Sequence, residues 1–242
     1  DYCLTTEADN LYLPFSRFQA ENEINLADAV DWGLDIAEIA LQAEKAGLEW
    51  HEITLNCLRI DEDGQIRVID PRIVDKIKRY RDDMASIIMQ ENYYPPEVIE
   101  NGKWQRESRL YSFGVILYYL TTGVAPFPGD DKAEIYDKII AGSIVEPKYI
   151  NYNLSRELND LIMKLLATDP DNRYSHWQEV VSQLKNIKEK KLFQADIKMA
   201  DKNKARGNRV IKMKNIKDSI MFTLKRRSIL IGTLIFISLL IA

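Results

Sequence analysis

Apolar positions recur most regularly between Leu26 and Ala46, where they lie three and four residues apart. Asn25 stands directly before this stretch and is suited to act as an N-cap, and Gly47 follows it. The pattern predicts an amphipathic helix that begins after Asn25 and ends at Gly47.

Strand-like segments lie on either side of this helix. Residues 1–18 predict a hairpin with YCLTT and LYLPF as strands, EADN as the turn, and Pro14 at an edge or strand end. CLRI and IRVI predict a second, smaller hairpin within 54–70, with Gly64 supplying the backbone freedom for its turn. Residues 75–91 are polar and irregular, and the prolines of the following YYPPEVIENG exclude a continuing helix.

The most apolar helical stretch is 110–121, LYSFGVILYYLT. A helix without a polar face is buried in a domain, and this one is too short to cross a bilayer. Two or three amphipathic helices are predicted after it, around 133–141, 155–166 and 175–188. The elements together predict a mainly helical α+β domain.

Charge is distributed unevenly along the chain. Residues 201–227 hold ten Lys or Arg against two acids, so this segment carries +8, and subtracting it from the chain's −4 leaves −12 for the rest. An acidic body argues against nucleic-acid binding, which needs basic faces to neutralise phosphates. Cys3 and Cys57 fit neither a disulfide framework nor zinc-ligand spacing and predict buried thiols in a reducing compartment.

The last fifteen residues, 228–242, carry no charge and directly follow the basic segment. A span needs about 20 apolar residues, and this run is still apolar where the sequence stops. Two interpretations are open, a transmembrane anchor and a buried C-terminal helix. Positive charge beside an apolar run is typical of the cytoplasmic side, so we expect a single-pass membrane protein with its acidic body in the cytoplasm and lysines near anionic lipid. We also expect the chain, which begins with Asp, to be an internal part of a longer protein.

Three motifs occur in order after the small hairpin: YYPPEVIENG, SRLYSFGVILYYLTTGVAPFPGDD and LLATDPDNRYS. With the preceding helix and a hairpin that ends in Asp70, they resemble the C-terminal lobe of the eukaryotic-type protein kinases over about 2–187. The resemblance implies that Glu97 of the Pro-Pro-Glu motif pairs with Arg173, as a scaffold contact.

The resemblance implies an α+β protein-kinase-like fold with four parts. Residues 1–25 would form the end of the N-lobe and the hinge, and 26–192 the mainly helical C-lobe. A basic juxtamembrane linker would follow at 193–227, and a single transmembrane helix would begin at 228–242.

The resemblance also locates the catalytic loop, His-Arg-Asp followed by Lys and Asn in the family, at 50–57. Glu52 stands at the position of the catalytic Asp, with its carboxylate one methylene further out, and misplacement by about 1 Å can lower a rate about a hundredfold. Thr54 replaces the Lys, which removes a charge from the transferring phosphate. Cys57 replaces the magnesium-binding Asn, and a thiol is a poor ligand for that hard cation.

Further positions follow from the same comparison. Asp70 stands at the magnesium-binding Asp of Asp-Phe-Gly, but Pro71 and Arg72 replace the Phe and Gly. Phe15 falls at the gatekeeper position beside the nucleotide. Arg109 replaces the Asp that usually opens the buried helix and has no acceptor group. ATP and magnesium are the cofactors that the resemblance implies.

Alternatives stay open at three positions. Glu52 is either a slow base or a residue that caps or solvates its loop. Asp70 either holds a metal with a nucleotide or is a structural carboxylate bonded to backbone amides. His51 either reads a phosphorylated activation loop in place of the family's Arg or is an ordinary polar loop residue.

Scaffold positions match the family more closely than chemical positions do. The matches are Gly64, Pro96, Glu97, Gly114, Pro126, Phe127, Asp169, Pro170 and Arg173. This selectivity predicts a membrane-anchored pseudokinase that serves as a signalling or assembly module with protein partners. Two alternatives remain, an active but divergent Ser/Thr kinase and a switch that binds nucleotide without turnover.

Overall fold

The computed structural model describes residues 13–48, 53–61, 63–69 and 90–190. The chain divides into two units, Asp1–Lys188 and Glu189–Ala242, and nearly all described residues belong to the first. The predicted linker and anchor lie outside the described residues, as does the strand YCLTT. Within the described ranges, no helix is both long and apolar enough to cross a bilayer.

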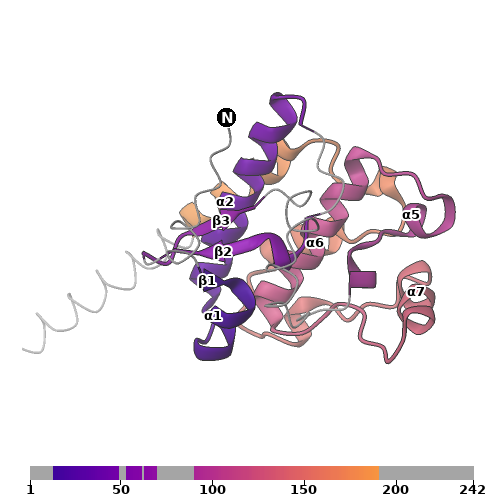
Figure 1. Cartoon of the computed structure of the whole chain (residues 1–242), viewed down its shortest axis with the longest axis horizontal. Coiled ribbons are helices and arrows are strands. Elements are labelled where there is room, and N and C mark those ends of the chain that lie inside the picture. Colours follow the sequence, from indigo (N-terminus) through magenta and orange to yellow (C-terminus); the bar gives the residue numbers. More distant parts are fainter. Residues whose placement is uncertain (1–12, 49–52, 62, 70–89, 191–242) are drawn as a thin grey trace, which may run out of the picture. The chain divides into compact units, whose positions relative to one another are not determined.

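A three-stranded antiparallel sheet in the order β1-β2-β3 forms one edge of the first unit (Figure 1). Its strands are β1 (Leu13–Pro14), β2 (Leu58–Ile60) and β3 (Ile66–Val68). Leu13 pairs with Ile60, which pairs in turn with Ile66. Gly64, at a φ of 77°, adopts the left-handed conformation in the β2–β3 turn, so the predicted small hairpin is confirmed.

The predicted strand LYLPF, the second of the first hairpin, is wrong beyond Pro14. Phe15 begins helix α1 (Phe15–Glu21), and its buried ring packs edge-on against Trp32 with 6.0 Å between ring centroids. Phe18, one turn later, meets the same indole at 5.7 Å. Residues three apart share a helix face but not a strand face, so packing against Trp32 favours the helix. Pro14 does end a strand, as the sequence predicts.

The long helix α2 (Leu26–Lys45) agrees with its prediction at both ends. The Asn25 side chain accepts hydrogen bonds from the backbone N–H groups of Ala27 and Asp28, at 2.8 and 3.0 Å. Trp32 of α2 donates its indole N–H to the Gly64 carbonyl at 2.9 Å, which holds the β2–β3 turn against the helix.

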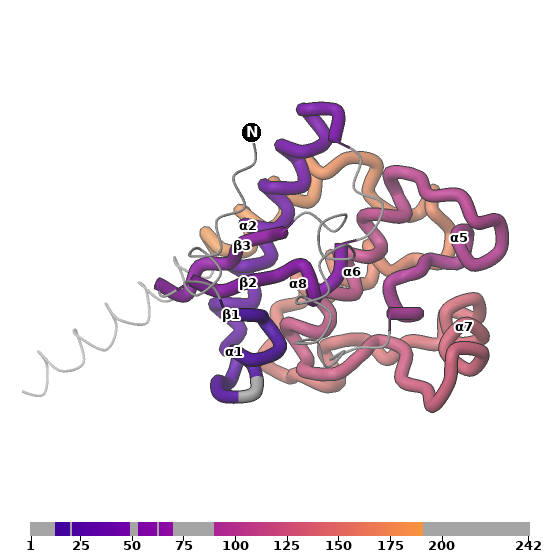
Figure 2. The backbone as a smooth tube through the Cα atoms, in the orientation of Figure 1, coloured from indigo at the N-terminus to yellow at the C-terminus, as the bar shows by residue number. Residues whose placement is uncertain are grey.

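Helix α6 (Arg106–Thr122) runs through the centre of the unit (Figure 2). Thirteen of its seventeen residues are buried, which confirms the predicted interior helix. It begins four residues earlier than its apolar run, because Gln105 and Ser108 form a capping box ahead of that run. It ends at Gly123, whose φ is 76°.

The remaining helices pack around α6 or beside it. They are α5 (Pro96–Asn101), α7 (Lys132–Ile140), α8 (Arg156–Leu165) and a helix that covers 177–190 of the described residues. Ser155 caps α8, and Asp131 caps α7, each through a side-chain oxygen. The predicted amphipathic helices are therefore confirmed, with the last beginning two residues later than expected.

Candidate functional site

Two segments that are distant in sequence converge on α6. The Ser112 hydroxyl of α6 donates to the Tyr93 carbonyl at 2.8 Å, while the Tyr93 hydroxyl accepts from the backbone N–H of Leu55 at 3.3 Å. Tyr93 thus links α6 to the segment Thr54–Cys57. Asn92 extends this junction, because its side-chain carbonyl accepts from the backbone N–H of Phe127 at 3.0 Å.

An ion pair between Arg173 and Glu97 lies beside this junction. The Arg173 side chain is fully buried and donates to both carboxylate oxygens of Glu97, at 2.8 and 2.9 Å. Its three other N–H donors bond to the carbonyls of Ala167, Thr168 and Glu107, at 2.8, 3.1 and 3.0 Å. Because all five donors are engaged, the buried charge is fully satisfied.

The neighbours of this pair set its electrostatics. Burial would by itself raise the pKa of Glu97, but hydrogen bonds from Arg173 and Ser108, with the Arg173 charge, lower the pKa below its ordinary value. The Arg173 guanidinium lies over the Tyr111 ring, 5.0 Å from its centroid. Burial raises the pKa of the Tyr111 hydroxyl, so this phenol stays neutral.

Thr54 and Cys57 meet in the interior. The Cys57 sulfur lies 3.6 Å from the Thr54 hydroxyl oxygen, at the two ends of a turn that includes the 3-10 helix Leu55–Cys57. Both residues are buried, with Cys57 only 2% exposed. The two side chains therefore lie against each other inside the domain.

Arg109 lies in the first turn of α6. It lines a narrow cleft together with Ile53, Leu48 and Trp177. Arg109, which the resemblance places where the family has an acceptor Asp, thus lies near Ile53, the residue before Thr54.

Residues 54–193, more than half of the chain, match a family described as the protein kinase domain. The chain belongs to the protein kinase family. The helical part and the small sheet are therefore parts of a protein-kinase-like domain, as the resemblance implies.

Two bacterial relatives are similar over about two thirds of the chain. A probable serine/threonine-protein kinase from Clostridium perfringens is 32% identical over 161 residues, which are 66% of this chain and 24% of the relative. One from Clostridium acetobutylicum is 26% identical over 167 residues, 69% of this chain and 25% of the relative. The mouse protein kinase C delta type is 30% identical over 128 residues, 52% of this chain and 18% of the relative. The chain thus spans about a quarter of its bacterial relatives.

The kinase positions fall partly within the described residues. Glu52, His51 and Asp70 lie outside them, so the base and metal positions stay predictions. Cys57, which the resemblance places at the magnesium-binding Asn, has its thiol buried against Thr54. Phe15, at the predicted gatekeeper position, packs on Trp32 in the core.

Protein kinase domains use ATP and magnesium, and the described part of the site fits the metal poorly. The predicted Asn position, Cys57, offers a buried thiol, which is a weak ligand for a hard cation. No cluster of three His, Cys, Asp or Glu suited to a metal occurs among the residues that the structure describes. Asp70, the predicted metal position, lies outside those residues.

The sequence did not reveal Tyr93 in the junction or Ser108 beside the ion pair. Both are buried or bonded only because segments distant in sequence meet at α6. The signal that could have found Tyr93 is its place two residues before the Pro-Pro-Glu motif.

Proposed function

We propose that the chain is part of a membrane-anchored pseudokinase, a kinase fold that serves as a signalling or assembly module. The observation that carries the proposal is the burial of Cys57 against Thr54. These residues stand where an active kinase has a magnesium-binding Asn and a phosphate-directed Lys. The Cys57 thiol supplies no oxygen ligand at the Asn position, and Thr54 supplies no positive charge at the Lys position.

The retained structural contacts also support this proposal. Arg173 and Glu97 retain the pair that the family uses to hold its C-lobe together, with all five Arg173 donors engaged. A fold that keeps its structural contacts while its catalytic positions change is suited to binding rather than turnover. Phosphoryl transfer depends on charge and positioning, and the substitutions at Glu52, Thr54 and Cys57 alter both.

The test is phosphate transfer from labelled ATP by the full chain, with magnesium or manganese, to itself and to a generic basic protein. We expect no transfer above that of an Asp70→Ala variant, from protein shown by its cooperative thermal unfolding to be folded. Transfer that is present in the wild type and lost in both Asp70→Ala and Glu52→Ala would establish an active, divergent kinase instead.

The relatives favour that second candidate, since two are described as probable serine/threonine-protein kinases. A third candidate, a nucleotide switch without turnover, predicts that millimolar ATP raises the melting temperature by mass action. Measuring transfer and melting temperature on the same preparation separates the three candidates.

The membrane anchor is a proposal that rests on the sequence. Residues 228–242 are uncharged and follow ten basic residues within 201–227, so the body would lie in the cytoplasm. We expect the full chain to stay with membranes after an alkaline wash, and a chain that ends at residue 227 to be released. Release of both would remove the anchor from the proposal.

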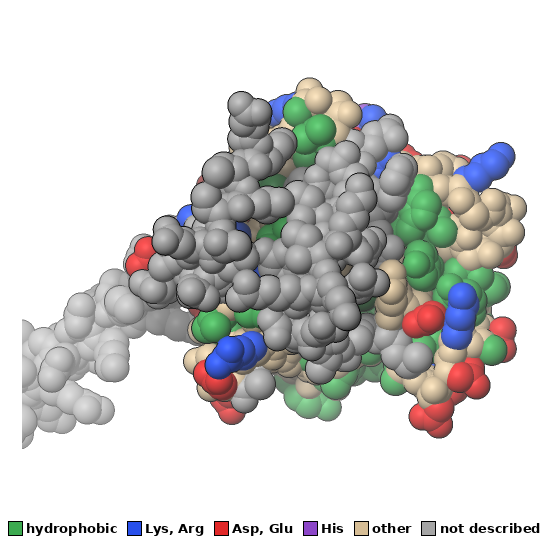
Figure 3. Space-filling model, viewed as in Figure 1, with side chains coloured by type: hydrophobic (Ala, Val, Ile, Leu, Met, Phe, Trp, Pro, Cys, Tyr) green, Lys and Arg blue, Asp and Glu red, His purple; other side chains and the backbone are tan. Residues whose placement is uncertain are grey.

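Protein partners fit the body better than nucleic acid does. Acidic side chains gather at two corners of the face shown in Figure 3, and the chain outside 201–227 carries −12. Such a surface repels phosphates and attracts basic segments of proteins.

A further inference from the structure

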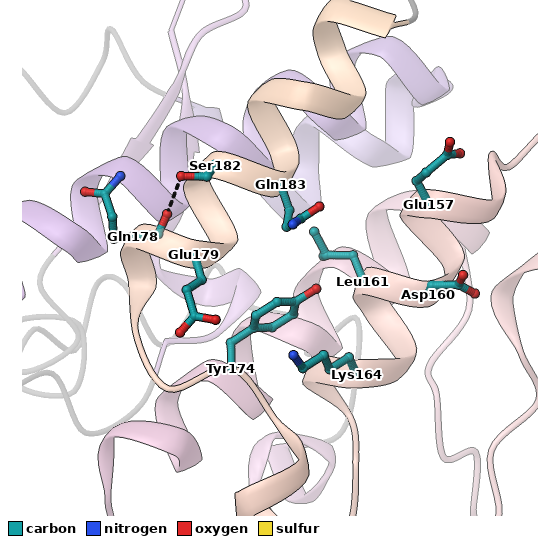
Figure 4. Close-up of a pocket in the computed structure, with 9 residues that line it drawn as sticks. All are labelled: Glu157, Asp160, Leu161, Lys164, Tyr174, Gln178, Glu179, Ser182 and Gln183. Atoms are coloured by element: carbon teal, nitrogen blue, oxygen red, sulfur yellow. Dashed lines mark hydrogen bonds between the residues drawn. The ribbon is translucent and has the colours of Figure 1, made fainter.

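A groove of about 610 Å³ runs between α8 and the helix at 177–190, away from the α6 junction (Figure 4). Leu161, from α8, and Tyr174, from the loop before the second helix, are buried at its base. Exposed polar residues form its two walls: Glu157, Asp160 and Lys164 on one side, and Gln178, Glu179, Ser182 and Gln183 on the other. A groove with a buried floor and polar walls can hold an extended segment.

Tyr174 is the feature that points to a ligand. Its side chain is only 9% exposed, yet its hydroxyl points between the two helices toward Leu161 and Gln183 (Figure 4). This hydroxyl makes no hydrogen bond to another residue that the structure describes, and it is not sealed from solvent. Burial, with the nearby charges of Glu179 and Asp160, raises the pKa of Tyr174, so the hydroxyl keeps its proton and can both donate and accept.

The charges around the groove select a cation. Glu157, Asp160 and Glu179 contribute three negative charges and Lys164 one positive charge. The Lys164 ammonium lies over the Tyr174 ring, 4.1 Å from its centroid, so it occupies one face of the ring and leaves the hydroxyl open. The lining side chains carry a net charge of −2, or −1 when Arg156 beside Asp160 is included, and this disfavours a phosphate or carboxylate ligand.

The carboxylates of Glu179 and Asp160 are only partly engaged by the protein itself. Glu179 accepts from the backbone N–H of Ser175 through one oxygen, at 3.3 Å. Asp160 faces the exposed Arg156 side chain at 3.5 Å, a weak pair that solvent screens. Glu179 and Asp160 therefore each retain acceptor capacity for an incoming basic side chain.

We propose that this groove binds a short arginine-containing segment of a partner protein, independently of whether the domain transfers phosphate. Arginine suits it better than lysine, because a planar guanidinium can donate to a wall carboxylate and to the Tyr174 hydroxyl at once. Acids on both walls favour a segment with two or more basic residues over a single small cation. The partner's remaining polar groups would bond to the Gln178 and Gln183 amides.

The test is fluorescence anisotropy of the full chain with a labelled twelve-residue peptide that carries three arginines, beside the same peptide with glutamines. We expect saturable binding of the arginine peptide and none of the glutamine peptide. Tyr174→Phe keeps the packing and removes only the hydroxyl, and should weaken binding about fivefold, the equivalent of one hydrogen bond. Glu179→Gln keeps the bond to Ser175, removes one charge, and should weaken binding by a similar factor.

A matched control removes one acid elsewhere. Asp137 is exposed on α7, which does not line the groove, so Asp137→Asn should leave the affinity unchanged. Equal weakening by Asp137→Asn and Glu179→Gln would mean general charge attraction and would overturn the site. Unchanged affinity in Tyr174→Phe would overturn the site as well. So would the absence of binding at about 1 mM peptide.

Discussion

Arg173 and Glu97, 76 residues apart in sequence, form a two-bonded ion pair whose guanidinium is fully buried. Removing one partner of such a pair leaves a charge without compensation in the interior. We expect Arg173→Ala to lower the free energy of unfolding by about 3–5 kcal/mol.

Urea unfolding followed by circular dichroism measures this loss. The control is Lys185→Ala, which removes an exposed pair with Glu38 at 2.8 Å and should change the unfolding free energy by less than about 1 kcal/mol. Similar losses of unfolding free energy in both variants would show that the buried Arg173 pair stabilises the fold no more than an exposed pair does.

The same pair predicts how stability depends on pH. Since the pKa of Glu97 in the folded protein lies below its ordinary value of 4.5, the pair stabilises the fold above that value and the benefit is lost as the pH falls through the folded pKa. Between about pH 5 and pH 3, wild-type stability should therefore fall more steeply than that of Glu97→Gln, which does not titrate. Parallel slopes in urea unfolding across this range would contradict the lowered pKa.

Tyr111 offers a stabilising change. Its hydroxyl is buried and has no hydrogen-bond partner within the part of the chain that the structure describes. A buried polar group without a partner costs about 1–3 kcal/mol, so Tyr111→Phe should raise the unfolding free energy by about 1 kcal/mol. Tyr118→Phe is the contrast, because that hydroxyl donates to the Val145 carbonyl at 2.9 Å and its removal should destabilise. A loss of stability in Tyr111→Phe would reveal a partner beyond the described residues.

The sequence predicted those features that are decided within a few residues. Asn25 caps α2 because a side chain needs only its own next turn, and Gly64 makes its turn through its own backbone. The strand prediction at Phe15 was wrong because a short apolar run fits either a strand or a helix. Only its packing against Trp32 decides between the two.

The site divides in the same way. The Arg173–Glu97 pair could be inferred because a family motif marks both ends. The contact of Cys57 with Thr54 depends on how one turn packs, and the groove at Tyr174 depends on two helices meeting. Neither leaves a periodicity in the sequence.

Gly114 sets how closely α6 and α8 approach. A Cβ atom added there would lie 2.8 Å from the Leu165 Cβ and 3.1 Å from the Leu166 side chain. The Leu165 Cβ is fixed to the α8 backbone, so the helices would have to separate, and Gly114→Ala should destabilise by about 1–3 kcal/mol. Gly102→Asn is the control. Gly102 has a positive φ of 67°, a conformation that Asn also adopts, and no atom lies within 4 Å of a Cβ added there. Equal unfolding midpoints for Gly114→Ala and wild type would contradict this packing.

Cys57 gives the prediction that bears most directly on function. Restoring the family's amide with Cys57→Asn places a larger polar group where the thiol is 2% exposed and lies against Thr54. We expect a loss of about 1–3 kcal/mol in urea unfolding, from overpacking and imperfect hydrogen bonding, and no gain in phosphate transfer from labelled ATP. Cys57→Ala is the matched control that vacates the space without adding polarity. If Cys57→Asn folds as stably as the wild type and transfers phosphate, the position faces the nucleotide and the site needs only one residue to regain chemistry.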